Sequence, residues 1–413
     1  MPKCFFWLLI SGISITLACN KEDEVLYAED VPLAMVNHHY TELPDYTTDI
    51  GEINISAMAN GNYNGMAVPS FIRSISKPND GYCHPDVQYF PEGYKGYKYW
   101  MVFTPYFGSV GTAQHSKRFE NPTVVVSNDG MNWTEPAGIK NPLALTPSIQ
   151  ESFLENKKEH KQGFWSDVDW LFTDNTFYLY YRGSFITAQA LKKRGAKSQN
   201  NNEKLKQSAQ RTIVRQTSTD GVHWTPLEVV YSSNPPYTPK NDHLLSPSFI
   251  KAGNTFCSYE VELNRGGKVF SGAEPSYVIQ RTSTDGLNFS LFKKSKIVNF
   301  INTPWKDINP RYAPWHLQAT YIDGFYFLCL ATGDVGKYTA DALFLAYSKD
   351  GVNFAVLPRA MVTQNVYRSA VFPMMSDDKT IDFGAVIGYK TGQFKYREFS
   401  LKKSELNSTL NIK

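Results

Sequence analysis

Carboxylates and a histidine stand at the starts of apolar, alternating segments of this 413-residue chain. Asp86 lies in HPDVQYF, two residues after His84, and Asp167 and Asp169 lie in SDVDWLF. A carboxylate in such a place either caps the amide groups of a turn or belongs to a polar active site, where it can exchange protons. The elements that position these residues decide between the two interpretations.

Four near-identical segments indicate what those elements are. Each reads Ser-x-Asp-Gly, with Trp or Phe three residues after the glycine: SNDGMNW (127–133), STDGVHW (218–224), STDGLNF (283–289) and SKDGVNF (348–354). Each follows an alternating run, and Asp-Gly between two such runs predicts a hairpin because glycine accepts a positive φ. The last three copies start 65 residues apart and the first gap is 91 residues, which indicates one repeated supersecondary unit.

A second type of hairpin, rich in Tyr, Phe, Leu and Val, recurs five times along the chain. The five segments are 84–106, 166–184, 245–262, 314–333 and 367–388. Two hairpins form a four-stranded sheet, so the pattern predicts an all-β chain folded as a five-bladed β-propeller.

The last blade lacks a fourth strand of its own. Residues 393–401 supply its third strand, and the N-terminal segment 66–75 is expected to close the ring beside it. We therefore predict a propeller over residues 66–405 and a short tail over 406–413. The polar stretch 190–210 is interpreted as a solvated excursion of blade two, which accounts for the longer first gap.

This hairpin arrangement resembles the propeller superfamily of arabinanases, β-xylosidases, fructosidases and related glycoside hydrolases, over nearly all of residues 76–405. In that superfamily three carboxylates from blades one to three reach a central funnel. One is a base or nucleophile, one tunes pKa and orientation, and one is a general acid. Glycosidic cleavage needs two of these carboxyls on either side of the bond, and a third charge raises the pKa of the acid. The resemblance supports the fold more strongly than the activity, because the hairpin motif is structural.

The resemblance implies roles for two aspartates. HPDV stands where the family has its base, so that role passes to Asp86. Alignment of the hairpins places Asp169 at the pKa-tuning position, with Asp167 as its neighbour on the same strand face.

Blade three departs from the family pattern, since DHLLSPSFI (242–250) contains no glutamate where the acid belongs. Glu260 is predicted as a displaced acid, and the other candidates are Glu262, Asp242 and His243. Two functions stay open: a glycoside hydrolase acting on a plant or algal polysaccharide, or a glycan-binding protein without catalysis.

Further polar and aromatic residues fall at equivalent funnel positions and are predicted to bind the sugar: His84, Trp165, Arg182, Trp315, His316 and Arg368, with Tyr367 beside them. Arg and His suit contacts to hydroxyl, uronate or sulfate groups, and a Trp can be either a stacking platform or a core residue. The spacing of the histidines matches no metal motif, so no metal and no cofactor is predicted.

The N-terminus predicts export. Residues 1–18 have a lysine, a short apolar stretch and small residues before Cys19, the layout of a signal peptide. ITLAC resembles a lipobox, so we expect Cys19 to be lipidated and 19–65 to include a tether. The following NKEDE resembles the surface-export signal of some bacterial lipoproteins. We therefore expect a chain anchored to the outer membrane and exposed at the cell surface; a plain signal peptide cut near Ala18 is the alternative.

The composition of the chain limits the classes of partner that we expect it to bind. The net charge is +3 with 20% charged residues, which is not the basic patch that nucleic acid requires. Cys83, Cys257 and Cys329 remain after the signal, an odd number at irregular spacing that indicates no disulfide framework. The expected partner is a poly- or oligosaccharide, and we expect a monomer.

Overall fold

The computed structural model describes residues 33–35, 44, 46, 49–56, 62–63, 66–67, 81–107, 119–144, 160–187, 209–232, 244–263, 274–291, 294–337 and 339–412. Several predicted features lie outside the described residues: the signal peptide 1–18, Cys19, most of the tether, the excursion up to residue 208, Asp242 and His243. Within the described part, no helix is long and apolar enough to cross a membrane.

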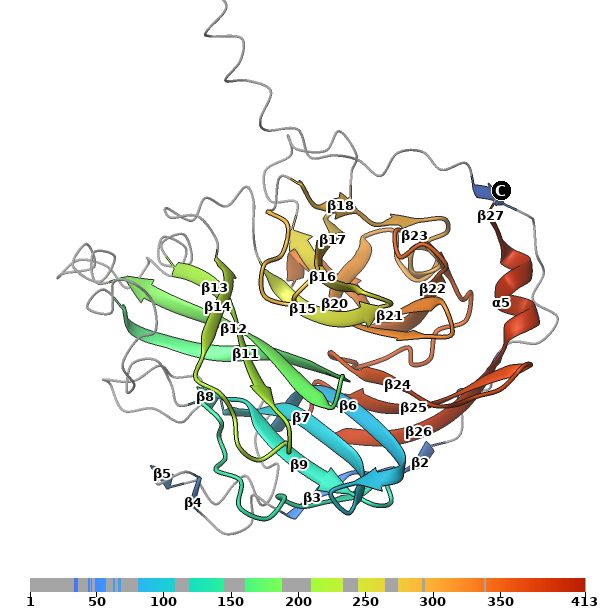
Figure 1. The fold of residues 1–413 in the computed structure, drawn as a ribbon. Coiled ribbons are helices and arrows are strands. Elements are labelled where there is room, and N and C mark those ends of the chain that lie inside the picture. Colours follow the sequence, from blue (N-terminus) through green and yellow to red (C-terminus); the bar gives the residue numbers. More distant parts are fainter. Residues whose placement is uncertain are drawn as a thin grey trace, which may run out of the picture.

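Five antiparallel sheets are arranged around a common centre, which confirms the five-bladed propeller (Figure 1). Blade one holds β6 (Gly81–Tyr94), β7 (Tyr97–Phe107), β8 (Phe119–Glu120), β9 (Thr123–Ser127) and β10 (Asn132–Trp133). Blade two holds β11 (His160–Thr173), β12 (Thr176–Thr187), β13 (Ala209–Ser218) and β14 (Glu228–Ser232). Blade three holds β15 (Leu245–Ala252), β16 (Thr255–Leu263), β17 (Ser276–Ser283) and β18 (Lys296–Ile297). Blade four holds β20 (Tyr312–Ile322), β21 (Phe325–Asp334), β22 (Ala342–Ser348) and β23 (Asn353–Val356). Blade five holds β24 (Ala370–Ser376), β25 (Thr380–Gly388) and β26 (Phe394–Lys402).

Small elements decorate these sheets. They are β3 (Asn54–Ile55), β4 (Asn62–Tyr63), β5 (Met66–Ala67), β19 (Asn299–Phe300), α4 (Trp305–Ile308), the 3-10 turn η5 (Val335–Lys337) and α5 (Lys403–Thr409). Near the C-terminus, β1 (Leu33–Met35) pairs with β27 (Leu410–Ile412).

An N-terminal strand closes the ring, but the segment differs from the expected 66–75. Strand β2 (Asp49–Glu52) pairs antiparallel with β26, Gly51 opposite Tyr396, whereas Met66–Ala67 pairs with β4. The propeller therefore begins near residue 49. The closing strand is four residues long, too short to show an alternating pattern, while Pro69 in the expected segment cannot donate to a ladder.

The Asp-Gly hairpins connect neighbouring blades. In blade three, Asp285 accepts the amides of Leu287 and Asn288 at 2.9 and 2.8 Å, which fixes the turn. Gly286 has φ +68° and lies against Tyr180 of blade two, whose hydroxyl donates to the Gly286 carbonyl at 2.6 Å. The other three hairpins lie against an aromatic ring of the preceding blade in the same way: Gly130 against Tyr396, Gly221 against Trp100 and Gly351 against Tyr259.

Candidate active site

The innermost strands β6, β11, β15 and β20 each carry one polar residue that accepts an amide from the next blade. Together these four residues form what we call the structural layer: Asp86, Asp169, Ser248 and Gln318. The amides of Trp170, Phe249, Ala319 and Val371 donate to them in turn, at 2.8, 2.7, 2.8 and 3.1 Å. Each bond joins one blade to its successor, so the layer holds the inner strands together.

Two bonds of the structural layer also span the ring axis. The Gln318 amide of blade four donates to Asp86 Oδ1 of blade one at 3.1 Å. Arg368, which precedes β24 of blade five, donates to Asp169 Oδ1 of blade two at 2.8 Å. With Val87 N donating to Asp86 and Ser248 Oγ to Asp169, every carboxylate oxygen of the two aspartates accepts a hydrogen bond.

Asp86 therefore shows the amide-capping geometry that was one of its two interpretations; its catalytic role stays a prediction that this geometry does not favour. Burial raises the pKa of Asp86 to about 7, against its amide donors and Arg368. Burial also raises the pKa of Asp169 well above its usual range, the charge of Asp86 adds to this, and Arg368 opposes it. Two adjacent buried carboxyls cannot both ionise freely.

A second set of residues forms what we call the site layer. His84, Asp167, Ser246 and His316 each lie two positions before a residue of the structural layer, and Arg182 of β12 and Arg368, which precedes β24, complete the set. In blades one to three the backbone at these positions is left-handed, with φ of 54°, 50° and 50° at His84, Asp167 and Ser246. Bulges interrupt the pairing there, between Cys83 and Asp86 and between Ser166 and Asp169. Strained, bulged backbone re-aims side chains and concentrates at functional sites.

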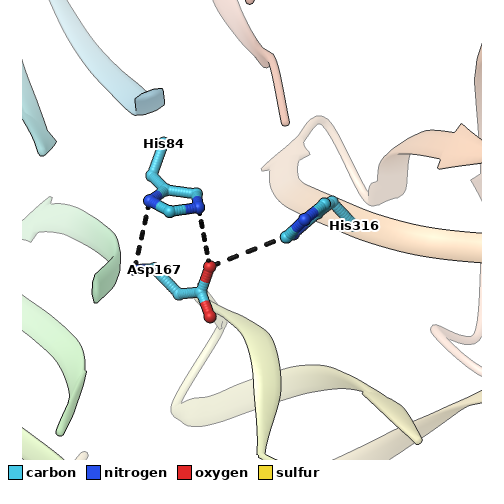
Figure 2. A group of neighbouring side chains, drawn as sticks. All are labelled: His84, Asp167 and His316. Carbon is cyan, nitrogen blue, oxygen red and sulfur yellow. Dashed lines mark hydrogen bonds and ion pairs between the residues drawn. The ribbon is translucent and has the colours of Figure 1, made fainter. Parts of the chain in front are cut away.

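Asp167 lies between His84 and His316 and contacts both of them (Figure 2). Its Oδ1 lies 3.0 Å from His84 Nε2 and 3.9 Å from His316 Nδ1, and its Oδ2 lies 2.8 Å from Arg182 Nη2. The ring of Tyr367 packs against both imidazoles, with centroids 4.5 Å from His316 and 5.5 Å from His84. All of these side chains except Tyr367 are at least nine-tenths buried.

The pKa values of His84 and His316 are shifted in opposite directions. Burial works to raise the pKa of Asp167, but Arg182 and His84 outweigh it and hold that pKa well below its usual range. Burial works to lower the pKa of His84, but Cys83 and Asp167 raise it to about 10. Burial lowers the pKa of His316 far below its usual value, Asp167 opposes this, and the charges of His84, Arg368 and Arg182 add to it. Without a bound ion, these surroundings favour the protonated form of His84 and the neutral form of His316.

The site layer contains polar atoms without partners. In the part of the chain that the structure describes, both ring nitrogens of His316, Nε of Arg182, and Nε and Nη1 of Arg368 make no hydrogen bond although they are buried. Such atoms are rare in folded proteins and indicate an absent water, ion or ligand.

Three residues of the site layer, His84, Asp167 and His316, are suited to hold a divalent cation. The ligand atoms of His84, Asp167 and His316 lie within 4.8 Å of one another, and two imidazoles with a carboxylate suit zinc or a similar metal. The sequence predicted no metal because the three residues come from different blades, so no local spacing links them. Asp167 was noted there only as the neighbour of Asp169, and the left-handed bulge that separates their roles leaves no pattern in the sequence.

The other predicted site residues are distributed unevenly. His316, His84, Arg182 and Arg368 gather at the site layer as expected. Trp315 is 8% exposed, with its ring edge-on to His316. Trp165 is 1% exposed and edge-on to Tyr181, which is typical of a core residue; its stacking role stays a prediction that this packing does not favour.

Glu260 does not reach the axis. It bonds to Tyr231 of blade two and to Arg281 Nε at 3.1 Å, between the outer parts of blades two and three. Glu262, fully buried on the same strand, accepts the amide of Leu244 at 3.2 Å. Neither glutamate, the two blade-three candidates that the structure describes, bonds to Asp86, whose partners are Val87, Trp170 and Gln318.

No protein-family model matches the sequence. A curated relative, the A type blood N-acetyl-α-D-galactosamine deacetylase of Flavonifractor plautii, is 24% identical over 319 residues, 69% of this chain. The aligned region spans 36% of that relative's length, a little over a third.

Solved structures share the fold. A crystal structure of an N-acetylgalactosamine deacetylase from F. plautii, in complex with blood group B trisaccharide, has a TM-score of 0.54 at 18% identity, covering 81% of this chain and 94% of that one. A family 117 glycoside hydrolase from Zobellia galactanivorans has a TM-score of 0.46 at 14% identity, covering 79% and 86% of the two chains. At these identities the comparison bears on the fold alone, which the deacetylase structure shares with this chain.

Proposed function

We propose that this protein is a glycan-acting hydrolase whose site layer removes an acyl group, such as N-acetyl, from a sugar. The observation that carries the proposal is the cluster of His84, Asp167 and His316, which offers one carboxylate and two imidazoles rather than two opposed carboxylates. The deacetylase named for the curated relative supports the same class of reaction. In the overall reaction, water adds to the amide carbonyl, the C–N bond breaks, and the products are a carboxylate and an amino sugar.

The chain's own residues prepare the site for a divalent cation. Such an ion, when bound, supplies Lewis-acid polarisation and lowers the pKa of water. Arg182 holds Asp167 Oδ2 at 2.8 Å and so leaves Oδ1 directed toward the two histidines. Tyr367 packs on both imidazoles and fixes their planes. Thr104 Oγ1 lies 2.8 Å from His84 Nδ1, so that ring presents Nε2 to the centre. These contacts preorganise the ligands before any ion arrives.

A second candidate is glycoside hydrolysis of a plant or algal polysaccharide, with Asp86, Asp169 and Glu260 in the predicted roles. It is favoured by the raised pKa values of Asp86 and Asp169, which are typical of an acid–base pair. The full engagement of their oxygens by amides, the ion pair of Asp169 with Arg368 and the position of Glu260 weigh against it. Glycan binding without catalysis is the third outcome that an assay can give.

One assay separates these functions. The full chain, freed of metal and then reconstituted with zinc, is incubated with an N-acetylgalactosamine-terminated oligosaccharide and with plant and algal polysaccharides. Release of acetate that depends on zinc, and that His316→Asn abolishes, supports the proposal. Release of mono- or oligosaccharide without acetate contradicts it and supports the glycosidase. Binding without any product supports the third function.

We also propose that the chain is anchored to the outer membrane through lipidated Cys19 and faces the cell exterior, where polymeric glycans are accessible. The support is the signal-like N-terminus and the ITLAC sequence. Cys19→Ser should move the protein from the membrane fraction to the soluble fraction. An unchanged amount in the membrane fraction would contradict lipidation.

A further inference from the structure

Two arginines of the site each bond through Nη2 and leave other buried N–H groups of the guanidinium unbonded. Arg368 Nη2 donates to Asp169 Oδ1 at 2.8 Å and to the Pro247 carbonyl at 3.1 Å, while its Nε and Nη1 make no hydrogen bond. Arg182 Nη2 contacts Asp167 Oδ2 at 2.8 Å and donates to Ser166 Oγ at 3.2 Å, while its Nε makes none. The guanidinium plane is rigid, so the contacts of Nη2 restrict the directions of the remaining N–H groups.

The two arginines come from opposite parts of the ring and converge. Arg182 lies on β12 of blade two and Arg368 precedes β24 of blade five. Arg182 pairs with Asp167 and Arg368 with Asp169, two residues further along β11, so both guanidinium groups lie beside the inner strand of blade two. Tyr367, next to Arg368 in the chain, is half-buried and packs its ring against His316. A ligand group beside β11 can therefore meet both guanidinium groups.

Burial makes the unbonded N–H groups costly. Arg368 is 0% exposed and Arg182 is 9% exposed, and guanidinium cannot lose its proton to escape the penalty. A buried charged donor without a partner costs on the order of a few kcal/mol. The carboxylates that touch these arginines, Asp167 and Asp169, already accept bonds from other donors as well. The remaining donors match a group with two or more negatively charged oxygens.

We propose that the funnel binds a sugar that carries an oxyanion, either the carboxylate of a uronic acid or a sulfate ester, through the unbonded N–H groups of Arg182 and Arg368. The inference rests on the proposed function insofar as the ligand is a glycan, and it adds the substrate class. Neutral hydroxyl groups would fill the same hydrogen bonds but would bring no negative charge to the guanidinium N–H groups that Asp167 and Asp169 leave unbonded.

Binding to the full-length, metal-free protein tests the proposal by titration calorimetry. The probes are two matched pairs: N-acetylgalactosamine 6-sulfate with N-acetylgalactosamine, and galacturonic acid with galactose. We expect at least one acidic sugar to bind about tenfold or more tightly than its neutral partner, because a charge-assisted bond exceeds a neutral one by roughly that factor. Preference within the first pair identifies a sulfate ester, and within the second a carboxylate. Equal affinities within both pairs overturn the proposal, and so does inorganic sulfate that binds as tightly as the sulfated sugar.

Three variants assign the preference to the residues. Arg182→Gln should abolish most of the preference for the acidic sugar. Arg368→Lys keeps the positive charge but loses the planar guanidinium donors, so it should reduce this preference. Arg215→Gln is the matched control, since Arg215 is also 9% exposed but pairs with Glu228 on the outer strand of blade two. A preference that persists in Arg182→Gln, or that falls equally in Arg215→Gln, overturns the assignment.

Different results would refute the proposed deacylation and the proposed preference for an acidic sugar. An acidic-sugar preference without acetate release from any substrate would refute the proposed reaction and keep this inference. Acetate release from neutral sugars by a protein that shows no acidic preference would refute this inference alone. The wild-type measurements need no variant, so they remain decisive even where Arg368→Lys fails to fold.

Discussion

At the residue scale, Asp167 and Asp169 show how two positions can separate chemistry from structure. Both are buried aspartates on β11, and both accept an amide of blade three, from Ser246 at Asp167 and from Phe249 at Asp169. The other partners of Asp169 are Ser248 Oγ and Arg368, whereas those of Asp167 are two histidines and Arg182. The bulge at Ser166–Asp169 and the left-handed φ of Asp167 place them in different layers. Asp167 is the carboxylate that can meet a ligand, because the ring nitrogens of its neighbour His316 make no hydrogen bond.

The capping role of Asp86 predicts a stability defect. Asn at this position keeps one acceptor oxygen, but its amide nitrogen would face the N–H of Trp170 or the Gln318 amide, both of which are donors. We expect Asp86→Asn to lower the free energy of unfolding by about 1–3 kcal/mol, the cost of unsatisfied buried donors. Urea unfolding measures it, with Asp174→Asn, at an exposed aspartate that pairs with Lys251, as control. Equal stability of wild type and Asp86→Asn would contradict the structural role.

At the element scale, the hairpins and the layers differ in how far the sequence reveals them. The Ser-x-Asp-Gly turns are local, since Asp285 bonds to amides two and three residues away, and the sequence therefore predicted them and the number of blades. The site layer depends on bulges and on contacts between residues such as His84 and His316, which are far apart in the chain. Trp165 was ambiguous for the same reason, because only packing against Tyr181 favours a core position for it.

The contact between hairpin and preceding blade predicts the effect of a single methyl group. A Cβ at Gly286 would lie 2.7 Å from the Tyr180 hydroxyl oxygen, at φ +68°. We expect Gly286→Ala to destabilise the fold by about 1–3 kcal/mol through backbone strain and the displaced tyrosine. Gly253→Ala is the matched control, because Gly253 also has positive φ, +57°, but nothing lies within 4 Å of its Cβ. Thermal unfolding should show a clearly larger loss for Gly286→Ala; equal losses would mean that strain alone matters.

The hairpin aspartates predict how the protein responds to acid. Burial works to raise the pKa of Asp129, but the bonds from Asn132, Met131 and Ser127 together outweigh it and lower that pKa to about 2. The pKa of Asp285 is lowered by its own turn amides. A folded-state pKa below the unfolded value stabilises the fold above pH 4 and loses that contribution as pH falls toward 2. Denaturation midpoints between pH 5 and 2 should fall less steeply in Asp129→Asn than in wild type. Parallel curves for the two proteins would contradict this contribution.

At the scale of the whole molecule, the ring is closed by chain segments from its two ends. Strand β2 completes blade five beside β26, the carbonyl of Tyr46 accepts a bond from Arg397 at 2.8 Å, and Ile53 N donates to the Phe394 carbonyl at 3.0 Å. Strand β3 then pairs with β10 of blade one, so the same short segment joins the last blade to the first. The site layer takes residues from blades one, two, three and four and from the start of blade five, so its geometry depends on this closure.

Removal of the closing segment should therefore weaken the whole ring rather than one edge. A chain that starts at residue 57 lacks β2 and β3, leaves β26 as an open edge and exposes the residues beneath, including Tyr396 and Phe394. We expect its thermal midpoint to fall by several degrees or more in a single transition, with loss of binding at the site layer. A chain that starts at residue 44 keeps Tyr46 and both strands and serves as control. Loss of protection confined to β26 in hydrogen exchange, with an unchanged midpoint, would show that the blades are held by the structural layer alone.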